Sequence, residues 1–198
     1  MIRELSSRVA KWLEQEGVIS SDDKGLFSYA VYSLLFGLLP IFIIGLLGLA
    51  LGMLREGFLM IIPFMLIRKF SGGYHLNSSK ICIILSVTLL TLVMQYIKLV
   101  VQSGGIFLLT VLVPLSGLCL CTFSPVENHA RKLTNKEKQL FHKIACILAM
   151  AAVAVYLIMY KTAPVQYTAA FGAGIVLVAT LQIFGVIEQT KEQCIDHM

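Results

Sequence analysis

The chain has 198 residues, of which 58% are hydrophobic and only 14% are charged, and its mean hydropathy is +0.84. Soluble globular domains carry about 25% charged residues, so this composition excludes an ordinary soluble domain and predicts a membrane protein. The formal net charge of +5 does not indicate nucleic-acid binding, because the basic residues lie in short loops between apolar runs.

The first segment, residues 2–16, places apolar residues at helical spacing with charged residues between them. This pattern predicts an amphipathic helix lying in the membrane interface, where Trp12 favours anchoring and Gly17 ends the helix. A solvated helix packed on another part of the chain is the alternative. We expect no signal peptide, because the first apolar run starts only at Leu26.

Six apolar runs follow, and they predict an all-α integral membrane protein with about six transmembrane helices. The runs are residues 26–54, 57–67, 81–97, 106–123, 144–160 and 163–187. The second run would be only about 16 Å long as a helix, too short to cross the ~30 Å hydrocarbon core alone. It is therefore either re-entrant or a short helix shielded by its neighbours.

We expect one membrane-embedded domain over residues 1–198, with an interfacial helix at 1–24, a transmembrane core at 25–187 and a cytoplasmic tail at 188–198. Basic residues gather before the first run, around residues 68–80 and in the loop after Phe123. Because cytoplasmic loops are enriched in Lys and Arg, these segments and both termini are predicted to face the cytoplasm.

The cysteines and histidines predict neither structural disulfides nor a metal site. The five cysteines form an odd set with no framework spacing, and Cys119 and Cys121 are interpreted as small helix-packing residues. There is no HExxH motif, which argues against a zinc protease. Three histidines lack partners at ligand spacing: His129, His142 and His197. Three glutamines within apolar runs are interpreted as interhelical hydrogen-bonding groups: Gln95, Gln166 and Gln182.

The stretch KFSGGYHLNSSKIC, residues 69–82, interrupts the apolar pattern with two glycines, a histidine and a cysteine. In one continuous helix His75 and Cys82 would lie about 10.5 Å apart along the axis, too far for proton transfer. A break between them is therefore required, and Gly72 and Gly73 permit it.

The same stretch also contains helix-start signals. Asn77, Ser78 and Ser79 are good N-cap residues for a helix that begins near residue 80. Cys82 would then fall in its first turn, where the helix dipole favours a thiolate. A loop bearing His75 could fold back over this turn and form the cysteine–histidine pair that nucleophilic catalysis requires.

The run RKFSGGYHL, residues 68–76, followed by Cys82, resembles the signature of the accessory gene regulator protein B (AgrB) family. That signature reads Arg, a few residues, Gly-Gly-x-His, six residues and Cys. A second stretch, SPVENHARKL at residues 124–133, followed by Glu137, is similar to the family's basic cytoplasmic loop. Length, hydropathy and the order of segments agree over essentially the whole chain.

The resemblance implies a membrane cysteine endopeptidase of Gram-positive bacteria. Such enzymes cut the C-terminal tail from a small AgrD-like propeptide and help to close the rest into a thiolactone or lactone ring for quorum sensing. Cys82 would be the nucleophile and His75 the general acid/base, with Gly72 and Gly73 shaping the turn and Arg68 matching the motif arginine. No cofactor is expected.

The expected partners are the lipid bilayer and an amphipathic propeptide with an acidic tail. Four basic residues would attract this tail: Arg68, Lys69, Arg131 and Lys132. Each of them could instead only keep its loop on the cytoplasmic side of the membrane. For the oxyanion donors we rank the free backbone amides near Ile81 first. Other candidates for supporting roles are Asn77, Ser78, Ser79, Glu127 and Asn128, of which Glu127 and Asn128 are interpreted as loop caps or tethers.

Two other classes of function stay open. A small transporter or exporter, such as one for a peptide, would also combine glycine-rich helices with intramembrane glutamines, but no charged residue lies deep inside the longer runs. A non-catalytic membrane scaffold is the third alternative. Small residues could support a homodimer or pack helices within one chain: Gly45, Gly48, Gly52, Ala169, Ala170 and Ala173.

Overall fold

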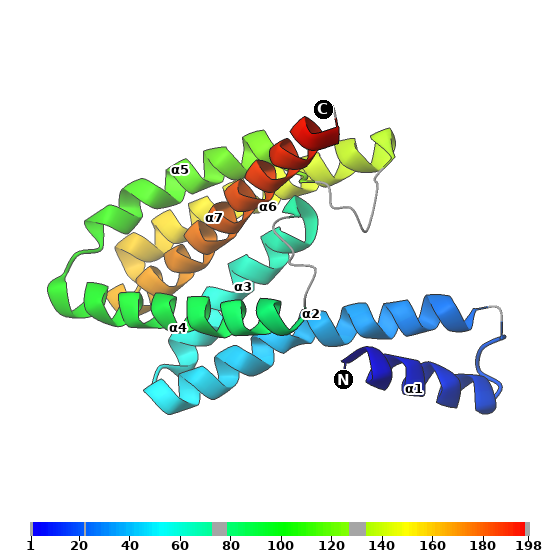
Figure 1. The fold of residues 1–198 in the computed structure, drawn as a ribbon. Coiled ribbons are helices and arrows are strands. Elements are labelled where there is room, and N and C mark those ends of the chain that lie inside the picture. Colours follow the sequence, from blue (N-terminus) through cyan, green and yellow to red (C-terminus); the bar gives the residue numbers. More distant parts are fainter. Residues whose placement is uncertain (1, 22, 73–78, 127–133, 197–198) are drawn as a thin grey trace. The chain divides into compact units, whose positions relative to one another are not determined.

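The computed structural model describes residues 2–21, 23–72, 79–126 and 134–196, which form α-helices and contain no strand. The helices are α1 (Ile2–Gln15), α2 (Lys24–Leu51), α3 (Leu54–Ser71), α4 (Ser79–Ser103), α5 (Phe107–Phe123), α6 (Asn135–Thr162) and α7 (Val165–Asp196) (Figure 1). Helices α2, α4, α6 and α7 contain segments long and apolar enough to cross a membrane, and α5 is a shorter apolar helix. The all-α membrane fold expected from the hydropathy is confirmed.

The chain divides into two compact units, Met1–Ile43 and Ile44–Met198. The first unit holds α1 and most of α2. Helix α1 buries Ala10, leaves Trp12 57% exposed and ends before Gly17, as its sequence predicts. A salt bridge of 2.6 Å joins Glu14 of α1 to Lys24 at the start of α2. An exposed tryptophan is suited to interfacial anchoring, which stays a prediction.

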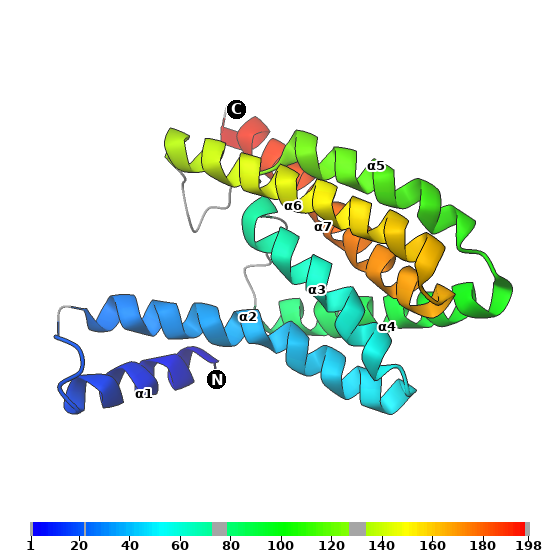
Figure 2. The ribbon, with the colours of Figure 1, turned by 180° about the vertical axis from the view of Figure 1, so that it is seen from behind.

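Helix α7 is the central element of the second unit, because α3, α4, α5 and α6 all pack against it. Figures 1 and 2 show α5, α6 and α7 running side by side, with α3 next to α7. A side chain on Gly174 would collide with the Met60 carbonyl oxygen and lie 2.9 Å from Cγ of Pro63. Small residues on α7, including buried Ala170 and Ala173, thus allow the backbone of α3 to approach closely.

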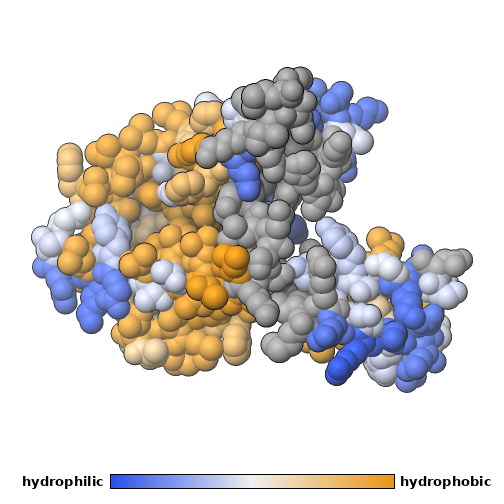
Figure 3. All heavy atoms as spheres, viewed as in Figure 1, coloured by the Kyte–Doolittle hydropathy of each residue, from blue (hydrophilic) through white to orange (hydrophobic). Residues whose placement is uncertain are grey.

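The outward faces of α4 and α5 are covered by large apolar side chains (Figure 3). Ile84, Leu92, Phe107 and Leu118 are each more than 60% exposed. Soluble proteins rarely expose apolar patches of this extent, whereas a lipid bilayer would cover them. The second unit therefore has a protein-facing core around α7 and a lipid-facing exterior.

Four helices are longer than their apolar runs: α3, α4, α6 and α7. Helix α3 has 18 residues and a length of about 27 Å, because charged residues continue it at both ends of the expected segment 57–67. Helix α3 packs on α6 and α7. This agrees with a short helix shielded by its neighbours rather than with a re-entrant segment. Helix α6 starts at Asn135 behind a capping box formed by Thr134 and Glu137, and α7 continues to Asp196. Hydropathy does not detect these polar extensions.

Candidate functional site at the end of helix α3

The last turn of α3 carries the start of the first motif. Arg68 is half-buried, with its guanidinium carbon 5.7 Å from the centroid of the Phe64 ring. The Lys69 ammonium lies 5.7 Å from the Phe70 ring, and Phe70 packs edge-to-face on Phe141 of α6 at 5.9 Å. Cation–π contacts of this kind attract a cation to an aromatic face. Aromatic side chains thus hold both basic residues at this end of the helix.

The helix then ends in a turn that only glycine fits. Ser71 is fully buried, and Gly72 has φ +73° and ψ −152°, a backbone conformation that is almost confined to glycine. A Cβ atom on Gly72 would collide with the Val126 carbonyl oxygen. The Val126 amide also donates a 2.9 Å hydrogen bond to the Ser71 carbonyl. The two motif stretches of the sequence therefore meet at one backbone contact.

The segment that follows α5 is fixed by buried polar contacts to Ser124. Its hydroxyl donates to the Leu120 carbonyl at 2.6 Å and accepts from Nε2 of Gln182 at 2.9 Å. Nδ1 of His142 lies 2.8 Å from the Ser124 carbonyl oxygen, and since a carbonyl only accepts, Nδ1 carries the hydrogen. Side chains of α6 and α7 thereby hold Ser124, while Val126 is bonded to the end of α3.

The structure places some of the predicted site residues and not others. Arg68, Lys69 and Gly72 lie at the end of α3, where Ser71 is hydrogen-bonded to Val126. Helix α4 starts at Ser79, close to the expected start, and Cys82 is its fourth residue. The other predicted site residues lie outside the described part of the chain: Gly73, His75, Asn77, Ser78, Glu127, Asn128, Arg131 and Lys132. The pairing of Cys82 with His75 therefore stays a prediction.

Two polar groups differ from their sequence interpretation. Gln182 forms the expected bond between segments, but Gln95 is exposed on α4. His142, for which no partner at ligand spacing was predicted, contacts Cys146 through Nε2 at 3.8 Å. The signal for this contact was the separation of four residues, which puts two side chains on the same face of a helix. In the described ranges no group of three or more His, Cys, Asp or Glu is arranged to hold a metal ion.

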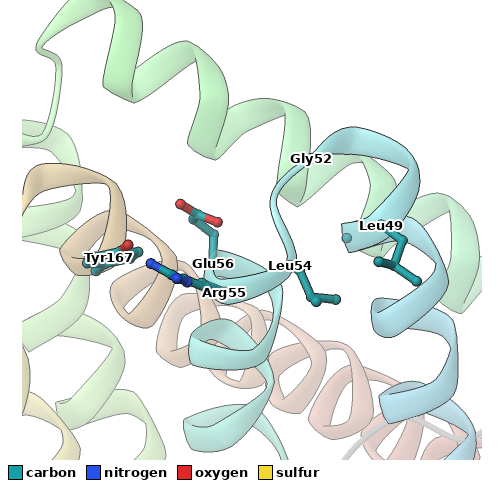
Figure 4. A pocket seen from close by; sticks show the side chains of 7 residues that line it. Leu49, Gly52, Leu54, Arg55, Glu56 and Tyr167 are labelled. Atoms are coloured by element: carbon teal, nitrogen blue, oxygen red, sulfur yellow. The ribbon is translucent and has the colours of Figure 1, made fainter.

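A pocket of about 410 Å³ lies at the opposite end of α3 (Figure 4). There Arg55 and Glu56 line the pocket together with Tyr167 of α7. Arg55 is exposed, and none of the predicted site residues lines this pocket. The end of α3 at Ser71 is therefore the better candidate for the functional site.

Comparison with known proteins identifies the family. A family model described as Accessory gene regulator B matches residues 6–186, a range that includes both motif stretches. The chain belongs to the accessory gene regulator B family.

Two relatives from Clostridium perfringens are similar over part of the chain. A putative AgrB-like protein 2 from strain 13 / Type A is 29% identical over 87 residues, and a putative AgrB-like protein from strain SM101 / Type A is 28% identical over 87 residues. Each match covers 44% of this chain and 41% of the relative, so the chain spans about two fifths of the length of these curated relatives. No solved structure matches the chain.

Proposed function

We propose that this chain is a membrane cysteine endopeptidase that removes the C-terminal tail of a small propeptide and promotes ring closure of the remaining peptide. Family membership supports the peptide-processing role. The observation that carries the proposal is the hydrogen bond between Val126 and Ser71, which joins the described beginnings of the two motif stretches. Along the chain, the residues proposed for cleavage follow Ser71 and those proposed for substrate recognition follow Val126.

In the proposed reaction the Cys82 thiolate attacks the carbonyl carbon of the scissile amide bond. His75 donates a proton to the leaving amine, the tail departs, and a thioester joins the peptide to Cys82. A cysteine thiol or serine hydroxyl of the peptide then attacks the thioester and displaces Cys82, which closes the ring. The thioester retains the acyl-transfer potential that hydrolysis would discard.

The position of Cys82 near the start of α4 suits a nucleophile. The positive end of the helix dipole stabilises a thiolate there. The first backbone amides of a helix have no intrahelical partner, so those of α4 are candidates to stabilise the oxyanion of the tetrahedral intermediate. Ser79 begins this helix, which makes the amides around Ser79 to Cys82 our preferred oxyanion donors.

The proposed substrate is an amphipathic propeptide with an acidic C-terminal tail. Its apolar leader would lie in the bilayer interface, and the tail would be drawn to the basic end of α3 at Arg68 and Lys69. Arg131 and Lys132 follow Val126 in the sequence and extend the same positive charge. The distribution of basic residues places this site on the cytoplasmic side in our proposal.

The experiment is co-expression of the chain with its candidate propeptide, followed by mass spectrometry of the products. We expect tail release and ring formation with the wild type, and loss of both with Cys82→Ala and His75→Ala. Cys82→Ser should lose most activity, because a serine hydroxyl is a weaker nucleophile at neutral pH. Cys119→Ala is the matched control, because Cys119 is a half-buried helix cysteine outside the motif.

Tail release that survives Cys82→Ala would overturn the proposal. If the chain were a transporter, the propeptide would stay uncut in every variant, but its location would depend on the chain. If the chain were a scaffold, the propeptide would stay uncut and its location would not depend on the chain.

A further inference from the structure

Helix α6 contains a cysteine–histidine pair, made by His142 and Cys146. Nε2 of His142 lies 3.8 Å from Sγ of Cys146. Nδ1 donates its hydrogen to the Ser124 carbonyl oxygen, so in the neutral form of the ring Nε2 carries the lone pair, on the side of the thiol. A thiol, a base within reach and a third group that orients the base form the arrangement that activates a cysteine.

A second thiol on α5 completes this cluster. Sγ of Cys146 lies 3.6 Å from the carbonyl oxygen of Cys121, and Sγ of Cys121 lies 4.0 Å from the carbonyl oxygen of Cys146. Both cysteines are free, so two reduced sulfur atoms face each other across the contact between α5 and α6.

The pair is accessible from the polar end of α6. His142 is exposed, Cys146 is half-buried, and exposed Lys143 lies between them in the sequence. Cys119 is also free and half-buried in α5, but it precedes Cys121 by two residues and therefore lies on a different side of that helix. It provides an internal comparison of the same residue type in the same helix.

We propose that Cys146 is a reactive thiol that exchanges with low-molecular-weight disulfides, with His142 as its base and Cys121 as its resolving thiol. His142 takes the proton of Cys146, and the thiolate attacks one sulfur of the small disulfide. The S–S bond breaks, and the departing thiolate takes the proton from His142, which leaves a mixed disulfide on Cys146. Cys121 then loses its proton to water and attacks Sγ of Cys146, and the second small thiolate leaves and is protonated.

The net reaction oxidises Cys121 and Cys146 to one disulfide and reduces one small disulfide to two thiols. It joins α5 to α6 next to Ser124, whose carbonyl His142 holds. Neither Cys82 nor His75 takes part, so this reactivity is independent of the proposed peptidase.

The test treats the purified full chain in detergent micelles with glutathione disulfide, and mass spectrometry maps the modified cysteines over time. We expect Cys146 to react at least roughly tenfold faster than Cys119, because Nε2 of His142 lies close enough to take the proton of Cys146 during the attack. The final product should be a Cys121–Cys146 disulfide, and Cys121→Ser should stop the reaction at the mixed disulfide on Cys146. His142→Gln should lower the rate at Cys146 toward that at Cys119.

The wild-type comparison of Cys146 with Cys119 needs no variant, so it remains decisive if a substitution disturbs folding. Equal rates at these two cysteines would overturn the proposal. An unchanged Cys146 rate in His142→Gln that still elutes as a monodisperse protein would overturn the role of His142.

Discussion

Helices α7 and α4 are both apolar enough to cross a membrane, but they have different surroundings. In the most apolar window, 61% of α7 is buried inside the chain, compared with 22% of α4. Helix α7 carries small residues such as Ala170 and Gly174 and the buried Gln182, whereas α4 presents Ile84 and Leu92 outward. Hydropathy thus identifies a membrane helix, but small residues and buried polar groups identify the face that contacts protein.

Substituting the same residue type should therefore lower the stability of the protein more in the surroundings of α7 than in those of α4 or α2. Glycines offer the clearest test, because some have a neighbouring backbone at contact distance and others have open space. The buried polar network around Ser124 offers a second test, because other hydroxyls on the same helices are exposed.

The largest effect is expected at Gly72, next to the segment held by α6 and α7. Gly72→Ala would add backbone strain of about 1–3 kcal/mol and a collision with the Val126 carbonyl of about 1–3 kcal/mol. Gly104, just beyond α4, is the control, because it has φ +68° and no atom within 4 Å of the position of a Cβ. Gly104→Ala should therefore lower the stability only by the backbone strain. Chemical unfolding in detergent micelles measures both, and propeptide cleavage should be lost only in Gly72→Ala. Equal losses in the two variants would show that the contact with Val126 contributes nothing.

A smaller effect is expected within the membrane core at Gly174. Gly174→Ala pushes a methyl group into the Met60 carbonyl and Pro63 of α3, which should destabilise the protein by about 1–3 kcal/mol. Gly45 of α2 has open space where a Cβ would lie, with no atom within 4 Å, so Gly45→Ala should be neutral or stabilise the helix by up to about 1 kcal/mol. Thermal unfolding of both variants in the same detergent checks the difference. A Gly174→Ala protein as stable as Gly45→Ala would contradict the close packing of α3 on α7.

The smallest effect is expected from the hydrogen bond between Ser124 and Gln182. Ser124→Ala removes the acceptor for the buried Gln182 amide and should cost about 1–2 kcal/mol. Thr180→Ala is the control on α7, the helix that carries Gln182, because Thr180 is exposed and its hydroxyl bonds to Val176 of the same helix. This substitution should change the stability by less than about 0.5 kcal/mol.

A double-mutant cycle with Gln182→Leu isolates this hydrogen bond, since the paired variant should lose less stability than the sum of the two single variants. Strict additivity would mean that the two side chains do not interact in the folded protein.

The sequence was sufficient for the fold class, because membrane helices must be long and apolar. It predicted about six transmembrane helices, whereas four of the described helices are long and apolar enough to span a membrane and α5 is a shorter apolar helix. The ends of α3, α4, α6 and α7 were also not predicted by the hydropathy. Arg55 and Lys69 lie within α3, and the capping box at Thr134 starts α6 before its apolar run. Helix propensity and capping set these ends, and hydropathy contains no information on either.

Part of the candidate site was also predictable. The motif residues near Gly72 follow from local spacing, and glycine was expected at a turn that other residues cannot adopt. The contact of Ser71 with Val126 could not be predicted, because it joins segments more than 50 residues apart in the sequence. The contact of His142 with Cys146 was not predicted, although a separation of four residues puts two side chains on the same face of a helix.

The most direct test of the proposed function is to identify the cysteine that carries the acyl intermediate. The chain is incubated with a propeptide whose ring-forming cysteine or serine is replaced by alanine, so that the thioester cannot be resolved by ring closure. Mass spectrometry of the digested protein should then find the tail-less peptide attached to Cys82 through a bond that hydroxylamine cleaves. Tail release with no adduct on Cys82, or with the adduct on Cys146, would contradict the assignment of Cys82 as the nucleophile.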